Sequence, residues 1–280
     1  MDLQASHSSK TNNENINPVP NRKVVGSALC QTGNQMFCAV AAMTYAKITG
    51  RRFCGLVKVM NKCYYPEYHT NTILRNVQYI DNIGLQGYTK FGGNGEYLCN
   101  YFPVTDVENV WLNDFFQDVR CVDRNIAYSL FKPYPDILKV IYEMYPDIND
   151  MVCIQVRRGD YVNLSDFNCY SKEELLAIID EFFQKDKIIF VSDDIKWCKD
   201  NFHGERYYFA DKEYKCSVEL DLYLQTQSKA NVISNSTFGW WGAFLNEHTE
   251  KVVCHWPWFK PGKINNMKYI LPEEWIKFNY

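Results

Sequence analysis

The stretch MVCIQVRRGDY, from Met151 to Tyr161, decides how the second half of the chain folds. Val152 to Val156 is a short apolar run rich in β-branched residues, which is typical of a buried strand. Arg157 and Arg158 then stand at the carboxyl end of that strand, where ligands bind in open α/β sheets. A guanidinium can donate two parallel hydrogen bonds to a phosphate, so this loop predicts an anion site.

The rest of the second half alternates short apolar runs with helical segments. Strands are predicted at residues 152–156, 187–191, 206–209, 231–234 and 251–254, and helices at 172–184, 195–202, 218–229 and 238–245. Ser171 and Glu174 form a capping box at the start of the first of these helices. Strands that alternate with helices indicate βαβ units and therefore a parallel sheet.

The first half of the chain gives one clear strand and one clear helix. The strand covers Lys23–Leu29, and the helix covers Met36–Thr49 and ends at Gly50. Gly33, Asn34 and Gln35 then occupy the turn between them, where the helix N-terminus offers N–H groups to an anion. A simple tight turn would explain the same three residues.

The remaining first half is less informative, and it contains the predicted domain boundary. Residues 51–130 have weak periodicity and predict only short strands and irregular helices, with a turn at Gly92–Gly95. Three prolines surround a predicted helix at Asp136–Tyr145. We expect a polar tail over residues 1–22, an N-terminal α/β domain over 23–145 and a C-terminal domain over 146–280.

Composition and charge narrow the class of protein. Of the 280 residues 46% are hydrophobic, enough for a sizeable core. The net charge of −3 does not favour nucleic-acid binding, and no apolar stretch is long enough for a membrane span. Because residues 1–21 contain no apolar segment that could be a signal peptide or anchor, we expect a soluble, cytoplasmic protein with a disordered tail.

The pattern of cysteines and acidic residues predicts no disulfide framework, metal or cofactor. The chain has eleven cysteines, an odd number, and no CxxC pair, which favours reduced and mostly buried thiols. No two cysteines or histidines have the spacing of zinc ligands. There is also no D-x-D triplet, a pattern whose carboxylates would hold a divalent ion against a diphosphate.

Three polar clusters follow three of the predicted strands and should lie on one edge of the parallel sheet. They are Arg157–Asp160, Ser192–Asp194 and Asn235–Thr237. The arginines can neutralise a pyrophosphate, and Asp193 or Asp194 can accept hydrogen bonds from ribose hydroxyls or from the donor edge of guanine. Ser236 and Thr237 stand at a helix start, which favours phosphate oxygens. Together the clusters predict a nucleotide-sugar site.

Each cluster also has a purely structural interpretation. Arginine and aspartate neighbours often pair with each other, and an RGD tripeptide at a strand end need not be an adhesion motif. Asp193-Asp194 and Asn235–Thr237 could cap the helices that follow them. Trp240 and Trp241 lie inside a predicted helix, where at least one should be core rather than a sugar platform.

Four motifs, taken in order, resemble the α-1,2-fucosyltransferases of glycosyltransferase family 11. They are TGNQMF (32–37), VRRGDY (156–161), FVSDD (190–194) followed by Trp197, and ISNSTFGWWGAFL (233–245). The resemblance implies a GT-B-like pair of Rossmann-type domains with the donor site at the carboxyl edge of the C-terminal sheet. It also implies inverting, metal-independent transfer of L-fucose from GDP-β-L-fucose to the 2-hydroxyl of a terminal β-galactoside. Residue 155 departs from the family pattern H-x-R-R-G-D, because Gln155 cannot become cationic.

The resemblance also implies roles for individual residues. Arg157 would hold the β-phosphate, and Arg158 and Asp160 would shape the same loop. Asp194, with Asp193, would face the guanosine, and Ser236 and Thr237 would meet the pyrophosphate or ribose beside Asn235. The other domain would line the cleft through Gly33, Asn34 and Gln35.

The general base and the exact substrates stay open at the level of sequence. Asp160 is the first candidate for the base, although it could equally hold an arginine in place, and Asp166, Glu96 and Glu219 are alternatives. The alternatives in function are transfer of another GDP-sugar or to another acceptor, and a non-catalytic protein that binds a nucleotide-sugar or glycan. The expected partners are GDP-fucose and a galactose-terminated glycan, without nucleic acid or membrane, and the oligomeric state is left open.

Overall fold

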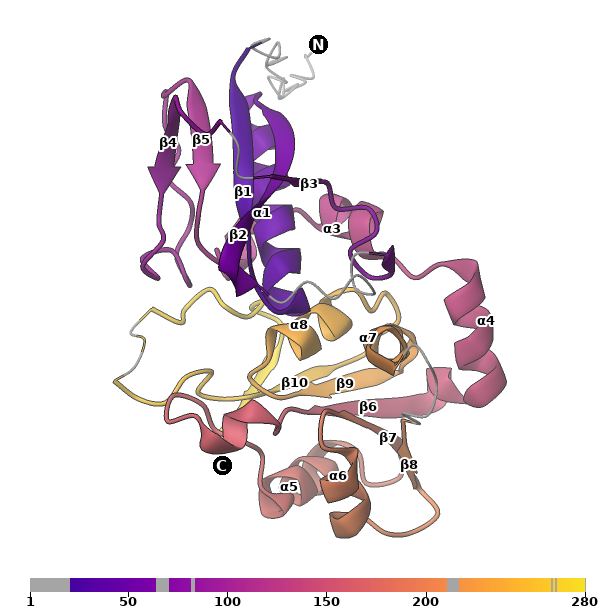
Figure 1. Cartoon of the computed structure of the whole chain (residues 1–280). Coiled ribbons are helices and arrows are strands. Elements are labelled where there is room, and N and C mark those ends of the chain that lie inside the picture. The colour runs from indigo at the N-terminus through magenta and orange to yellow at the C-terminus, as the bar shows by residue number, and fades with distance from the viewer. Residues whose placement is uncertain are drawn as a thin grey trace, which may run out of the picture.

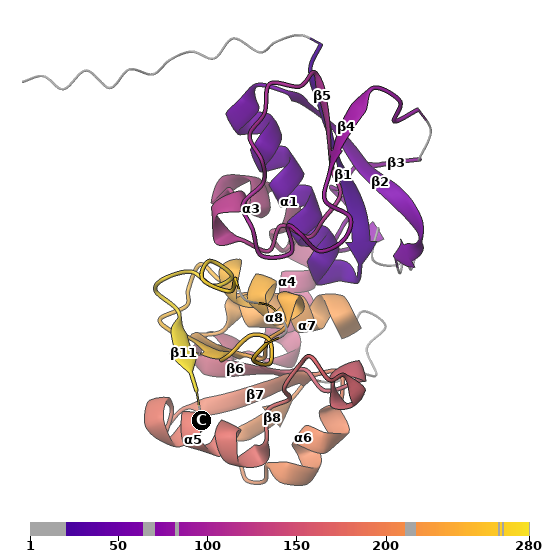
Figure 2. The same ribbon diagram turned by 90° about the vertical axis from the view of Figure 1, so that its left-hand side faces the viewer.

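The computed structural model of the chain contains two sheets, each built of parallel strands. The N-terminal sheet lies above the C-terminal, or lower, sheet (Figures 1 and 2). The structure describes residues 21–63, 71–81, 84–210, 217–262, 264 and 266–279. Residues 1–20 of the predicted tail lie outside this part of the chain. Every strand pair among the described residues is parallel, which confirms the predicted sheet type for both halves.

The N-terminal sheet is built around the first strand of the chain. Its elements are β1 (Lys23–Cys30), α1 (Thr32–Thr49), β2 (Arg52–Cys63), β3 (Tyr79–Ile80), β4 (Tyr88–Phe91), β5 (Asn109–Leu112), η1 (Val119–Cys121) and α3 (Arg124–Phe131). The strands run in the order β3-β2-β1-β5-β4, so β1 is central. Its interior residues are all buried, as expected for a strand that is covered on both faces.

The C-terminal sheet has the strand order of Rossmann-type folds. Its elements are α4 (Pro135–Met144), η2 (Ile148–Asp150), β6 (Met151–Val156), η3 (Asp160–Asn163), α5 (Lys172–Phe182), β7 (Lys187–Ser192), α6 (Ile195–Asn201), β8 (Tyr207–Phe209), α7 (Ser217–Gln227), β9 (Ala230–Ile233), α8 (Thr237–Phe244), β10 (Val252–His255) and β11 (Ile276–Phe278). The order β11-β10-β9-β6-β7-β8 reverses direction between β6 and β9. Ligands bind at such a reversal in open α/β sheets.

Three differences from the sequence predictions affect the site or the domain boundary. Helix α1 begins at Thr32, four residues before the predicted start, so Gly33, Asn34 and Gln35 form its first turn rather than a loop. The last strand, β11, was not predicted. Helix α4 packs against α7 beside the lower sheet, although the sequence placed its residues in the N-terminal domain (Figure 1).

One continuous hydrophobic core joins the two sheets. Helices α7 and α8 cover the face of the lower sheet that is turned toward the N-terminal half, and α5 and α6 cover the opposite face (Figure 1). The ring of Phe37 in α1 lies 4.6 Å from that of Trp240 and 4.8 Å from that of Trp241 in α8. Both tryptophans are fully buried, which confirms that they belong to the core. The indole N–H of Trp241 also donates to the carbonyl of Gly33 at 2.9 Å.

The described cysteines and helices add two observations. Nine cysteines of the described residues are free thiols, and six of them are buried. None of the helices in this part of the chain combines the length and the apolar character that a bilayer crossing requires.

Candidate functional site

A cavity of about 1060 Å³ lies between the two sheets, at the carboxyl ends of strands from both. Cys30 at the end of β1 lines it from above, and Gln155, Ser192 and Asn235 line it from the ends of three strands below. This volume is at the upper end of the roughly 300–1,000 Å³ that is usual for ligand pockets. The cavity is therefore large enough for a nucleotide-sugar together with a second sugar.

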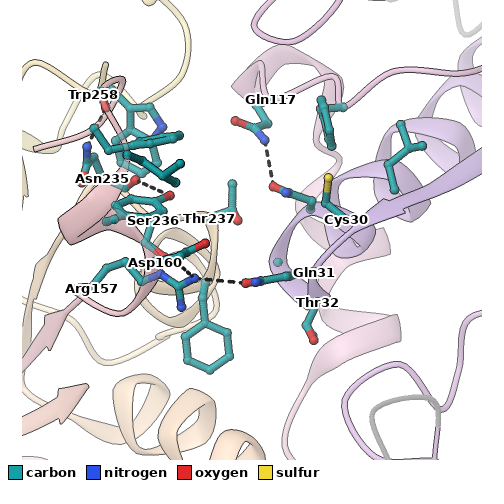
Figure 3. A pocket seen from close by; sticks show the side chains of 18 of the residues that line it. Cys30, Gln31, Thr32, Gln117, Arg157, Asp160, Asn235, Ser236, Thr237 and Trp258 are labelled. Atoms are coloured by element: carbon teal, nitrogen blue, oxygen red, sulfur yellow. Dashed lines mark hydrogen bonds and ion pairs between the residues drawn. The ribbon is translucent and has the colours of Figure 1, made fainter. Parts of the chain in front are cut away.

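Arg157 projects into the cavity from the strand reversal and is held by carboxylates. Its two terminal nitrogens lie 2.6 Å from a carboxylate oxygen of Asp160 and 2.9 Å from one of Asp193. It also donates to the side chain of Gln31 in the N-terminal half at 3.3 Å (Figure 3). The pairing of Arg157 with Asp160 is the structural alternative that the sequence left open.

Asp193 fixes the loop that carries the two arginines. One oxygen accepts the backbone N–H of Arg158 at 2.9 Å, and the other pairs with the guanidinium of Arg157. A Cβ atom at Gly159 would collide with this carboxylate, so the glycine allows the loop to approach it closely. Asp193 therefore lines the cavity and at the same time sets where Arg157 points.

The N-termini of two helices, one from each half, converge on the same cavity. Helix α1 starts after Gln31 and α8 starts after Ser236, and neither has a hydrogen bond from its N-cap side chain. Gly33 lies directly against Thr237 and the backbone of α8, so the two helix starts are in contact. Helix N-termini carry a partial positive charge, and two of them beside an arginine favour an anionic group.

Three of the predicted donor-site residues do not line the cavity. The guanidinium of Arg158 lies 4.2 Å from the ring centre of Trp197 and 3.2 Å from the carboxylate of Asp194. Asp194 accepts the backbone N–H of Trp197 at 3.2 Å, as the N-cap of α6. Gln35 is buried and bonded to the backbone of Cys30 and to Tyr79. Those that line it are Gly33, Asn34, Arg157, Asp160, Asp193, Asn235, Ser236 and Thr237.

Asp221 in α7 lines the cavity and was missed by the sequence reasoning. It is 6% exposed and close enough to Cys153 in β6 to help raise the pKa of that thiol, after the larger effect of burial. Gln155 follows Cys153 by two residues, and side chains two apart on a strand share a face. Asp221 and Gln155 thus lie on the same side of the sheet. An aspartate between two leucines of a predicted helix is the signal that could have identified it.

Of the four candidates for the general base, only Asp160 lines the cavity. Asp166 and Glu96 are exposed. Glu219 is fully buried, and this burial raises its carboxyl pKa. The structure therefore narrows the four candidates to one, and the catalytic role of Asp160 stays a prediction.

Comparison with known proteins assigns the chain to a family. The sequence model of the family described as Glycosyl transferase family 11 matches residues 136–278, about half of the chain. The chain belongs to glycosyl transferase family 11. The match includes β6, α7, β9 and α8, so the family 11 segment contains Arg157, Asp193 and Asp221. The sequence resemblance to this family is therefore confirmed.

Two curated relatives from Escherichia coli share part of the sequence. The O-antigen biosynthesis glycosyltransferase WbnK is 28% identical over 183 residues, 59% of either chain. An α-1,2-colitosyltransferase is 30% identical over 137 residues, 45% of this chain and 47% of the relative. The matched segments thus span less than two thirds of both relatives. The names of the two relatives, a glycosyltransferase and a colitosyltransferase, agree with the family assignment.

Solved structures confirm the GT-B-like fold. The α-1,6-fucosyltransferase NodZ, soaked with GDP-fucose, superposes with a TM-score of 0.54 at 13% identity, over 80% of this chain and 92% of NodZ. Another crystal structure of NodZ, from Bradyrhizobium, gives 0.53 at 12% identity, over 83% and 95%. At these identities the likeness establishes the fold alone. The substrates of this chain have to be inferred from its own site.

Proposed function

We propose that this protein transfers L-fucose from GDP-β-L-fucose to the 2-hydroxyl of a terminal β-galactoside, with inversion and without a metal ion. The observation that carries the proposal is the position of Arg157, at the strand reversal and beside two helix N-termini. This arrangement suits a diphosphate that gains charge as the sugar departs. Membership of family 11 and the fucosyltransferase fold of NodZ support the same assignment.

In the proposed reaction the acceptor hydroxyl attacks the anomeric carbon of fucose from the side opposite to GDP. The bond from that carbon to the β-phosphate oxygen breaks, and GDP leaves with the bonding electrons. Arg157 and the N–H groups of the helix starts stabilise the charge on this leaving group. Asp160 contacts Arg157 and has a half-exposed side chain at the cavity, where it could take the proton of the acceptor hydroxyl.

Asp221 and Gln155 form our proposed contact for the guanine base. A carboxylate can accept from the N1–H and the 2-amino group of guanine, and an amide can donate to its O6. Asp221→Asn replaces one acceptor with a donor, so we expect the KM for GDP-fucose to rise about tenfold or more. Calorimetric titration checks the contact by comparing the affinity for GDP with that for inosine diphosphate, which lacks the 2-amino group. Wild-type protein should prefer GDP, and Asp221→Asn should lose that preference; an unchanged preference would contradict the contact.

A donor assay in excess EDTA tests the proposed function and its metal independence together. Protein is incubated with GDP-fucose, with and without lactose, and product linkage is determined by NMR. We expect a fucosylated product with an α-1,2 linkage that forms equally well with EDTA. Activity that disappears with EDTA and returns with Mg²⁺ or Mn²⁺ would overturn the metal-independent mechanism, and GDP binding without any product would favour a binding protein.

Transfer of another GDP-sugar is a second candidate that two observations favour. One relative is named an α-1,2-colitosyltransferase, so similar sequences handle a sugar other than fucose. Gln155, where the family pattern has histidine, lines the cavity of this chain. A panel of GDP-sugars in the same assay separates the candidates, because the true donor should give the highest kcat/KM.

A further inference from the structure

The cavity has a second region, away from Arg157, that combines aromatic rings with a pair of amides. On the C-terminal side, the rings of Tyr161 and Phe167 are stacked with centres 4.1 Å apart, and Phe259 lies 5.4 Å beyond Phe167. All three line the cavity, and we call them the aromatic wall. Tyr161 lies 5.1 Å from the guanidinium carbon of Arg157, so the wall begins next to the proposed diphosphate site.

The amide pair belongs to the N-terminal half and consists of Asn34 and Gln117. The Nε2 of Gln117 donates to the Oδ1 of Asn34 at 3.0 Å (Figure 3). Gln117 is only 4% exposed, and its Oε1 accepts no hydrogen bond from another described residue. Both side chains line the cavity, and Figure 3 shows Gln117 across the open space from Asn235 and Trp258. A buried side chain therefore presents an unused acceptor, and Asn34 an unused donor, to a ligand.

The charges around the cavity select against an anionic ligand in this region. The described lining residues include four aspartates, Asp114, Asp160, Asp193 and Asp221, but only one cationic side chain, Arg157. The proposed function assigns Arg157 and the N-termini of α1 and α8 to the diphosphate of the donor, so they are not available to a second ligand. A bound GDP-sugar would add the negative charge of its diphosphate. A carboxylate on the second ligand would thus meet repulsion without a counter-ion.

We propose that the amide pair and the aromatic wall form the acceptor subsite, and that it takes an uncharged sugar ring. The apolar face of the ring packs on the wall, because C–H groups are attracted to the negative face of an aromatic ring. One hydroxyl donates to Gln117 and another accepts from Asn34. The ring then touches both halves of the protein next to Arg157, where the fucosyl group is to be received. The inference rests on the proposed function only in naming this ring as the acceptor.

Binding of a sugar to the GDP-loaded protein tests the subsite without requiring turnover. The probes are methyl β-D-galactopyranoside and methyl β-D-galacturonide, which differ by a carboxylate, and saturation-transfer NMR measures their affinities. We expect the neutral galactoside to bind and the galacturonide to bind at least about tenfold more weakly. Equal binding of the two sugars, or no binding of the galactoside, would overturn the proposal.

Gln117→Met removes the amide and keeps the length of the side chain. It should weaken galactoside binding about fivefold, the effect of one hydrogen bond, while the Kd for GDP stays unchanged. Gln184→Met, at an exposed glutamine that does not line the cavity, is the matched control and should change neither affinity. If Gln117→Met does not fold, Asn34→Ala removes the other half of the pair. Wild-type affinity for the galactoside in a folded variant would refute the amide contact.

The two proposals fail in different ways in these experiments. Loss of the proposed function would appear as absent turnover of GDP-fucose, with the preference for the neutral sugar still present. Loss of the acceptor subsite would appear as turnover of GDP-fucose together with wild-type acceptor affinity in Gln117→Met.

Discussion

Arg157→Lys should lower kcat by about 10- to 150-fold, which corresponds to the loss of one charge-assisted hydrogen bond of roughly 1.5–3 kcal/mol. Lysine keeps the positive charge but has a single ammonium in place of the planar fork that can hold two phosphate oxygens. The loss should appear in kcat more than in the KM for GDP-fucose, because charge on the diphosphate grows in the transition state. Steady-state kinetics with GDP-fucose and lactose measures both constants.

Arg158→Lys provides a comparison one residue away. In the wild-type protein the guanidinium of Arg158 lies over Trp197 and beside Asp194, outside the cavity. Arg158→Lys should therefore lose less activity than Arg157→Lys. The two changes are chemically identical and lie in the same loop, so the difference between them reports the position of the side chain. Near-wild-type kcat in Arg157→Lys would remove the phosphate assignment.

Gly33→Ala should destabilise the protein by about 1–3 kcal/mol and abolish most turnover. A Cβ atom at residue 33 would lie 2.7 Å from the Oγ1 of Thr237 and 2.8 Å from the backbone nitrogen of Phe238. Real Cβ atoms essentially never approach backbone this closely, so α1 and α8 would have to separate. The helix starts that form the anion site would then move apart. Urea denaturation measures the stability, and the donor assay measures the turnover.

A double variant identifies which atoms set the spacing of the two helices. Thr237→Ala in the Gly33→Ala background removes the hydroxyl but leaves the backbone contacts at Thr237 and Phe238. We expect no recovery of stability. Full recovery would mean that the threonine side chain, rather than the backbone of α8, limits the approach.

The second half of the chain could be predicted from its sequence because it alternates buried strands and helices. In β6 every residue is buried and all but Gln155 are apolar, so the strand is easy to recognise. The strand β4, by contrast, has a partly exposed residue at each end and two exposed residues between them, and β3 has two residues, neither of them buried. Such strands leave no hydrophobic period in the sequence.

The start of α1 was misplaced for a local reason. Gln31 occupies the N-cap position without a hydrogen bond from its side chain, so the usual serine, threonine, aspartate or asparagine signal is missing. By contrast, the capping box of Ser171 and Glu174 at α5 is present as predicted. The uncapped start also leaves the N–H groups of α1 available at the site, so the missing signal and the proposed anion site have the same cause.

The contacts of the site depend on tertiary structure to different degrees. The apolar run of β6 and the arginines that follow it made Arg157 predictable. The separate positions of Asp193 and Asp194, by contrast, depend on how the loop folds: one pairs with Arg157 and the other caps α6. Asp221 and Gln117 come from a helix and from a segment after β5, and only the packing of the two halves brings them to one cavity.

The rings of Phe37, Trp240 and Trp241, which pack where the two halves meet, have a consequence for how the protein unfolds. A single buried cluster contains these rings together with residues of both sheets. Neither half can be solvated alone without exposing large aromatic surfaces of the other, and that cost couples their stabilities. We therefore expect the two Rossmann-type units to unfold together, as one cooperative unit, despite the appearance of two domains.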